Sequence, residues 1–266
     1  MFMHPQIDPI AISLGPLKVH WYGLMYVLGL LSFLIIGKRR AKQPGSVITA
    51  EYVDDLIFWG AIGVVVGGRT GYMLFYNLKG LLADPLSYFQ IWGGGMSFHG
   101  GLIGVIIAML YLAHKWRLSF FQVSDFVAPL VPIGLGLGRL GNFINGELWG
   151  RHTDVPWGVV FPAVDDLPRH PSQLYQAFLE GVVLFILLNW YRRQSPPVGA
   201  ISGLFLVGYG TARILAEFFR EPDAQVGYLL GGWLTEGQLL SLPMVLLGAY
   251  FMWQAYQRQA TTCNNT

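Results

Sequence analysis

Charge is what this sequence has least of. Of its 266 residues, 12% are Asp, Glu, Lys or Arg, whereas a soluble domain carries roughly 25%. Hydrophobic residues make up 53% of the chain, and the mean hydropathy is +0.46. So little charge leaves too little polar surface for a water-soluble fold and predicts a protein of the lipid bilayer. The net charge of +2 gives no reason to expect a nucleic-acid partner.

Cysteine and catalytic motifs are also scarce. The single cysteine, Cys263 in the polar tail, excludes an intrachain disulfide and a CxxC site, and its position argues against a catalytic thiol. The histidines show no metal-ligand spacing, which argues against a metal enzyme; they are His4, His20, His99, His114, His152 and His170. No GxSG nucleophile motif occurs, which argues against an intramembrane serine protease.

What the sequence does contain is a series of apolar runs. A spanning helix needs roughly 20 mostly apolar residues, and we predict seven: 19–37, 56–76, 98–113, 121–138, 174–190, 199–219 and 239–253. The first seventeen residues hold no Lys or Arg, so the first run is predicted to be a retained helix and not a signal peptide. The fold class is therefore an all-α polytopic membrane protein.

The distribution of Lys and Arg predicts the topology. Basic residues are moderately enriched in the loops that would be inside if the N-terminus is outside and the C-terminus inside. The longest connection, residues 141–170, then lies outside, between spans four and five. Its aromatic residues Trp149, Trp157 and Phe161 predict a packed element and not a floppy linker. We expect a single transmembrane domain over residues 1–266 with residues 141–170 as an insertion.

Five polar side chains from different spans are predicted to reach the same outer membrane level: Tyr22, Arg69, His99, Arg139 and Arg220. Intramembrane charge is costly and tends to mark function. Structural alternatives stay open, because the arginines could extend to lipid headgroups, the tyrosine could sit in the interfacial aromatic belt, and a lone histidine at a helix start is more often structural.

A second set of intramembrane charges favours a structural interpretation. Arg213 and Glu217 are spaced i,i+4, and Glu180 is a candidate partner in another span. Such spacing is typical of pairing on a helix surface.

Two motifs favour a functional site at the outer level. In the segment 97–104, the glycines that follow His99 allow a helix or a headgroup to approach the backbone closely. In the segment 138–150, one Arg, two Asn and one Glu lie within nine residues, at Arg139, Asn142, Asn145 and Glu147. A guanidinium with two carboxamides is a suitable donor set for a phosphate or glycerol headgroup.

The second motif carries a family resemblance. The pattern G-R-x-G-N-F-[apolar]-N-x-E-x-x-G, from Gly138 to Gly150, resembles the signature of bacterial prolipoprotein diacylglyceryl transferases. Segments 20–26, 99–101, 169–175 and 218–223 also resemble that family, in the same order along the chain. One departure is Gln176, where the family more often has Glu, which puts a local hydrogen bond in doubt.

The resemblance implies an activity. Members of the family transfer the diacylglyceryl group of phosphatidylglycerol to the lipobox cysteine of a prolipoprotein, which forms a thioether and releases glycerol phosphate in the first step of lipoprotein maturation. It further implies a multi-pass enzyme of the bacterial inner membrane, with the outer side in the periplasm. The partners would be phosphatidylglycerol and prolipoprotein signal peptides, and no metal or organic cofactor is expected.

Site roles follow from the same resemblance. Arg139 and Arg220 would clamp the phosphate charge that develops on the leaving group. His99 would take the thiol proton, unless the leaving phosphate accepts that proton and His99 only positions the substrate. The remaining substrate-binding residues would orient the headgroup and the arginines, with Gly150 serving backbone shape; they are Tyr22, Asn142, Asn145, Glu147 and Gly150.

A membrane transporter of an anionic lipid or solute is the alternative. Secondary transporters tend to carry polar groups near the bilayer midplane and a pseudo-symmetric repeat. The polar cluster predicted here is at the outer level, and the two halves of the sequence do not match. These differences favour the transferase.

Overall fold

The computed structural model describes residues 2–15, 17–90, 94–222, 228–229 and 234–264. Asp223, the last residue of one family-like segment, lies outside these described residues. The chain divides into two compact units, Met1–Phe33 with Asp125–Thr266, and Leu34–Ser124. Each unit is described by itself below.

Within the described residues, six helical segments are long and apolar enough to cross a membrane. They are α1 (Trp21–Ala41), α2 (Ala50–Phe75), α4 (Phe98–Trp116), Phe120–Ile144, Ser172–Arg192 and Glu236–Thr261. The predicted polytopic helical class is therefore confirmed. The sixth predicted span is also a helix, α9 (Ala200–Glu217), but it contains Arg213 and Glu217 and is not among the six.

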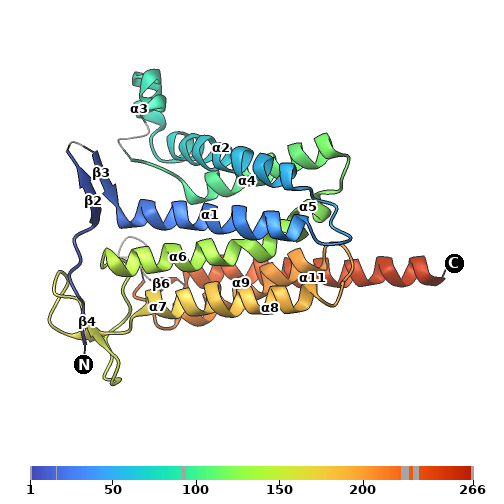
Figure 1. Ribbon diagram of the computed structural model, residues 1–266. Helices are drawn as coiled ribbons and strands as arrows, with labels where there is room; N and C mark the ends of the chain where they lie inside the picture. The colour runs from blue at the N-terminus through green and yellow to red at the C-terminus, as the bar shows by residue number, and fades with distance from the viewer. Residues whose placement is uncertain (1, 16, 91–93, 223–227, 230–233, 265–266) are drawn as a thin grey trace. The chain divides into compact units, whose positions relative to one another are not determined.

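The unit Leu34–Ser124 is built on a close pair of helices, α2 and α4 (Figure 1). Side-chain caps start both helices, since Thr49 accepts a hydrogen bond from the Tyr52 amide and Ser97 accepts one from the Gly100 amide. A Cβ at Gly104 would collide with the Gly63 carbonyl oxygen. These glycines therefore permit the close packing of the two helices.

Arg69 of α2 anchors the segment that joins the two helices. This segment contains α3 (Leu78–Ala83) and the 3₁₀ helix η1 (Pro85–Phe89). Arg69 is only 5% exposed and donates hydrogen bonds to the carbonyls of Ser87, Tyr88, Gly94 and Gly95. The possibility that Arg69 extends to headgroups is therefore wrong, because its guanidinium is buried and bonded to backbone.

In the other unit, each of two membrane segments is built from three helical pieces. Residues Phe120–Ile144 comprise α5 (Phe120–Val127), the 3₁₀ turn η3 (Ala128–Leu130) and α6 (Val131–Ile144), with Pro129 in the turn. Residues Ser172–Arg192 comprise α7 (Ser172–Gln176), the π-helical η4 (Ala177–Val183) and α8 (Leu184–Arg192). Segments α6 and η4 pack together, as do α9 and α11 (Glu236–Asn264).

This unit also contains short strands, which lie outside its helices. The N-terminal strand β1 (Phe2–Met3) pairs in parallel with β4 (Val159–Val160), which pairs antiparallel with β5 (Pro168–Arg169). Strand β2 (Ile10–Leu14) pairs antiparallel with β3 (Leu17–His20), and β6 (Tyr228–Leu229) pairs antiparallel with β7 (Leu234–Thr235). Because α6 continues to Ile144, the connecting segment begins at Asn145, four residues later than residue 141, the predicted start.

The start of α9 is held by a half-buried carboxylate. Asp125 of α5 accepts hydrogen bonds from the backbone amides of Gly199 and Ser202, at 2.6 and 2.8 Å, and from the Ser202 hydroxyl. Acceptors at a helix N-terminus satisfy otherwise unpaired amides. This contact fixes α9 against α5 and so helps to place the charged end of α9, described next.

Candidate functional site

A group of partly or fully buried charged side chains lies between α6, η4 and α9. Arg139 of α6 donates from Nε to Glu180 of η4 at 3.0 Å. At the end of α9, Glu217 pairs with Arg213 at 3.0 Å and with Arg220 at 3.4 Å. Glu180 is 0% exposed and Glu217 is 2% exposed, so these carboxylates are shielded from water.

The two ion-paired groups belong to one cluster. Arg213 interacts electrostatically with Glu217, Arg139, Arg220 and Glu180. The cluster therefore joins three arginines to two glutamates and carries a net positive charge. Sequence reasoning assigned Arg213, Glu217 and Glu180 to structural pairing and left them out of the site. Their intramembrane position was the available signal, but only the fold shows that Glu180 and Arg213 lie next to Arg139.

This arrangement suits an anion. Arg213 Nη1 is buried and has no hydrogen-bond partner among the described residues. A buried, unsatisfied cation is costly, and guanidinium groups bind phosphate through charge-assisted, often paired, hydrogen bonds. A phosphate at this place would offset the excess charge and satisfy the free nitrogen.

The polar residues after α6 adjoin the same cluster. Tyr22 of α1 packs on Gly141, where a Cβ would lie 3.0 Å from the tyrosine ring, and it interacts electrostatically with Arg139 and Glu147. Its hydroxyl lies 3.3 Å from that of Tyr26. An aromatic belt position does not account for these polar contacts, although the side chain is partly exposed.

Two asparagines and a glutamate shape the turn that ends α6. Asn142 is buried, and its carbonyl accepts a hydrogen bond from the Glu147 amide at 2.9 Å. Asn145 donates from Nδ2 to Glu147 Oε1 at 3.2 Å, while its own Oδ1 is buried and has no hydrogen-bond partner in the described part of the chain. The structure thus brings these predicted site residues together in one turn.

Gly150 belongs to the backbone frame of Arg220. The two residues form an antiparallel β-bridge, and a Cβ at Gly150 would collide with the carbonyl oxygens of His170 and Phe219. Arg151 adds a hydrogen bond from Nε to the Arg220 carbonyl at 2.9 Å. Any larger residue at position 150 would displace the backbone that carries Arg220.

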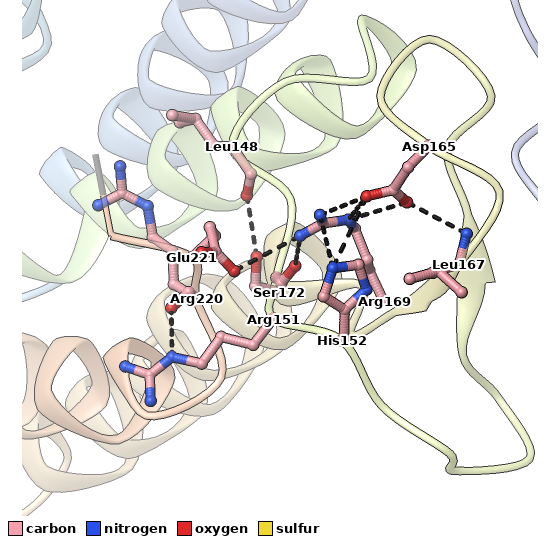
Figure 2. Close-up of polar contacts among 10 residues, drawn as sticks. Leu148, Arg151, His152, Asp165, Leu167, Arg169, Ser172, Arg220 and Glu221 are labelled. Atoms are coloured by element: carbon pink, nitrogen blue, oxygen red, sulfur yellow. Dashed lines mark hydrogen bonds and ion pairs between the residues drawn. The ribbon is translucent and has the colours of Figure 1, made fainter. Parts of the chain in front are cut away.

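Arg169 organises the connecting segment, as Figure 2 shows. Its guanidinium contacts Asp165, His152, Glu221 and the Gly150 carbonyl. Nearby, the Ser172 hydroxyl donates to the Leu148 carbonyl at 2.9 Å. The connecting segment, predicted to be a packed element, is therefore tied by Arg169 to Gly150 and to Glu221, which follows Arg220.

Two titratable groups of this segment have shifted pKa values. The hydrogen bond from Arg169 lowers the pKa of the Asp165 carboxyl, and the nearby charges of Arg169 and His152 act in the same direction. Burial lowers the pKa of His170, whose Nδ1 lies 3.1 Å from the Tyr175 hydroxyl. Both shifts favour the state in which Asp165 is ionised and His170 is neutral.

His99 lies in the other unit, in the first turn of α4. Its side chain is exposed, and its ring lies edge-on to that of Phe98 with centroids 5.6 Å apart. Of the eight predicted site residues, the other seven lie in the unit that contains the arginine cluster. No group of three His, Cys, Asp or Glu residues that could hold a metal occurs in the described part of the chain.

Comparisons with known proteins identify the family. The sequence model of the prolipoprotein diacylglyceryl transferase family matches residues 9–254. Phosphatidylglycerol–prolipoprotein diacylglyceryl transferases of Vibrio campbellii and Methylococcus capsulatus are 60% and 58% identical to this chain, over 96% and 98% of it and 93% and 100% of their own lengths. The chain therefore belongs to the prolipoprotein diacylglyceryl transferase family.

Proposed function

We propose that this protein transfers the diacylglyceryl group of phosphatidylglycerol to the lipobox cysteine of prolipoproteins. The largely buried cluster of Arg139, Arg213 and Arg220, with its excess positive charge, is the observation that carries the proposal. A lipid phosphate is an anion delivered from within the bilayer. The family membership and the names of the relatives support the same substrate and acceptor.

The reaction is a substitution at a glycerol carbon. The substrate thiol, whose usual pKa is about 8.5, loses its proton and the thiolate sulfur forms a bond to that carbon. The carbon–oxygen bond to the phosphate breaks, and its electron pair leaves with glycerol phosphate. His99 or the leaving phosphate accepts the thiol proton.

The arginine cluster would act on the leaving group. Arg139 and Arg220, now with Arg213, would bind the phosphate as its charge increases, and partial shielding from water strengthens that interaction. Tyr22, Asn142, Asn145 and Glu147 would orient the headgroup and the arginines, with Gly150 keeping the backbone that carries Arg220 in place. The two acyl chains require only an apolar surface open to the bilayer.

The membrane arrangement belongs to the same proposal. We place α9 as the seventh span, with the N-terminus and residues 145–171 in the periplasm and the C-terminus in the cytoplasm, in the bacterial inner membrane. The whole chain then forms one catalytic domain with a periplasmic insertion. The distribution of basic residues supports this orientation.

A direct test uses purified protein in proteoliposomes. Phosphatidylglycerol labelled in an acyl chain is supplied with a lipobox peptide, and label on the peptide is followed. We expect transfer to the wild-type peptide and none to a peptide with Cys→Ser. Absence of transfer by folded protein, across several anionic lipids, would contradict the proposal and favour a transporter.

A further inference from the structure

The Glu180 carboxylate has no part in the reaction described above, yet it is fully buried. One oxygen accepts the hydrogen bond from Arg139 Nε at 3.0 Å, and the other is buried with no hydrogen-bond partner among the residues that the structure describes. A buried ion pair is commonly no more stabilising than apolar residues of similar size. A gain in stability therefore does not explain why Glu180 is buried here, so we consider how it affects Arg139.

Backbone contact sets the distance between the two side chains. A Cβ at Gly181 would lie 2.9 Å from the Cα of Gly136, so α6 and η4 touch through their main chains. Arg139 follows Gly136 by one helical turn, and Glu180 precedes Gly181 directly. Glu180 also lies in the π-helical segment Ala177–Val183, a rare conformation that is frequent at functional sites.

The shape of the guanidinium decides which nitrogens of Arg139 the contact with Glu180 leaves available. An arginine presents its nitrogen donors in a rigid planar fork. Glu180 engages Nε, and no carboxylate of the described residues accepts a hydrogen bond from either terminal nitrogen of Arg139. The side that carries the two terminal nitrogens is the one suited to paired hydrogen bonds with phosphate.

We propose that Glu180 is a positioning residue, which holds the Arg139 guanidinium by Nε so that its terminal nitrogens meet the lipid phosphate. This inference rests on the proposed function, since the anion is the phosphate of phosphatidylglycerol. Tyr209 of α9 interacts with both Glu180 and Arg139 and adds a second constraint on the pair. If Glu180 only held the helices together, its effect on activity would be the same whether position 139 carried arginine or lysine.

The first experiment compares Glu180→Gln with Asn189→Ala. Asn189 is the matched control, because its side chain donates a hydrogen bond to the Pro129 carbonyl at 3.4 Å, between the same two membrane segments. For Glu180→Gln we expect kcat/KM per folded molecule to fall about 10- to 100-fold, since small misplacements of a binding group have effects of this order. For Asn189→Ala we expect a loss below about 3-fold. Equal losses in the two variants, or none in Glu180→Gln, would overturn the proposal.

A double-mutant cycle with Arg139→Lys separates positioning from bracing. Lysine has no Nε–H fork for Glu180 to align. In the Arg139→Lys background, Glu180→Gln should therefore cost less than about 3-fold, compared with at least about 10-fold in the wild-type background. The same fold-loss in both backgrounds would show that Glu180 only braces the helices.

A binding measurement covers the case in which Arg139→Lys has no measurable turnover. The melting temperature of purified protein is measured with added phosphatidylglycerol or phosphatidylcholine. We expect phosphatidylglycerol to raise it more in the wild type and in Asn189→Ala, and this difference to shrink in Glu180→Gln. An unchanged difference in Glu180→Gln would then overturn the proposal.

The lipid-dependent melting temperature also separates the transferase function from the positioning role of Glu180. If the wild type shows the lipid-specific shift but transfers no label to the peptide, the transferase function fails. A shift that nevertheless depends on Glu180 would still support its placement of Arg139 on an anionic headgroup.

Discussion

Helices α2 and α4 in one unit and segments α6 and η4 in the other both meet through glycine, but with different results. Around Gly63 and Gly104 the contact is backbone against backbone and serves packing. Around Gly136 and Gly181 a similar contact places a fully buried glutamate against an arginine. Glycine therefore sets helix distance in both places, and the neighbouring side chains decide whether that distance serves stability or chemistry.

The largest expected effect tests the charged region. Arg139→Ala should lower transfer by at least about 1,000-fold, since removal of one stabilising donor in an active site costs about 100- to 1,000-fold and Arg139 supplies two terminal nitrogens. Label transfer from phosphatidylglycerol to a lipobox peptide measures it, with the melting temperature as a check on folding. Retained turnover would contradict the phosphate clamp.

A smaller effect is expected at His99, which lies in the first turn of α4. A catalytic role there would mean that the α2–α4 unit serves chemistry as well as packing. His99→Gln should slow transfer by about 100-fold while leaving measurable activity, as is typical when a general base is lost but binding remains. The pH dependence of kcat/KM in wild type and variant would show whether a group of histidine-like pKa is lost. Full activity would remove His99 from the mechanism and leave this unit as scaffold.

The packing region itself is tested by two alanine substitutions. Gly104→Ala should lower the free energy of unfolding by about 1–3 kcal/mol, because its Cβ would collide with the backbone of Gly63. Gly60 on α2 is the control, since a Cβ there meets nothing within 4 Å. Unfolding followed by tryptophan fluorescence compares them, and equal stability of the two variants would contradict the proposed role of the glycine contact.

The smallest effect concerns the segment that frames Arg220. Because the pKa of Asp165 is lowered in the folded state, its contribution to stability is present above its unfolded pKa of about 3.9 and is lost as the pH falls through the folded value. Protease sensitivity of residues 145–171, measured between about pH 6 and 2, should rise at the acidic end. Asp165→Asn should weaken this pH dependence, and an unaltered profile would assign it to other groups.

Much of the site could be predicted because it lies close together in the sequence. Arg139, Asn142, Asn145 and Glu147 lie within nine residues, so a helix end and its following turn place them together whatever the rest of the fold does. The predicted pairing of Arg213 with Glu217 is confirmed at 3.0 Å, but i,i+4 spacing does not show that Glu180 pairs with Arg139. Arg69 shows the converse, since its partners are backbone carbonyls of the segment between α2 and α4, which no residue type reveals.

The sequence by itself determined the polytopic helical class and the family, because sparse charge and long apolar runs exclude other folds and the motif from Gly138 to Gly150 is local. It did not determine the cluster that joins Arg139, Glu180 and Arg213. That cluster depends on which helix faces pack together, and this was decided by the contact of Gly136 with Gly181 and by the cap of Asp125 on α9. Such contacts join residues far apart in the chain, so only the tertiary structure brings the charges together.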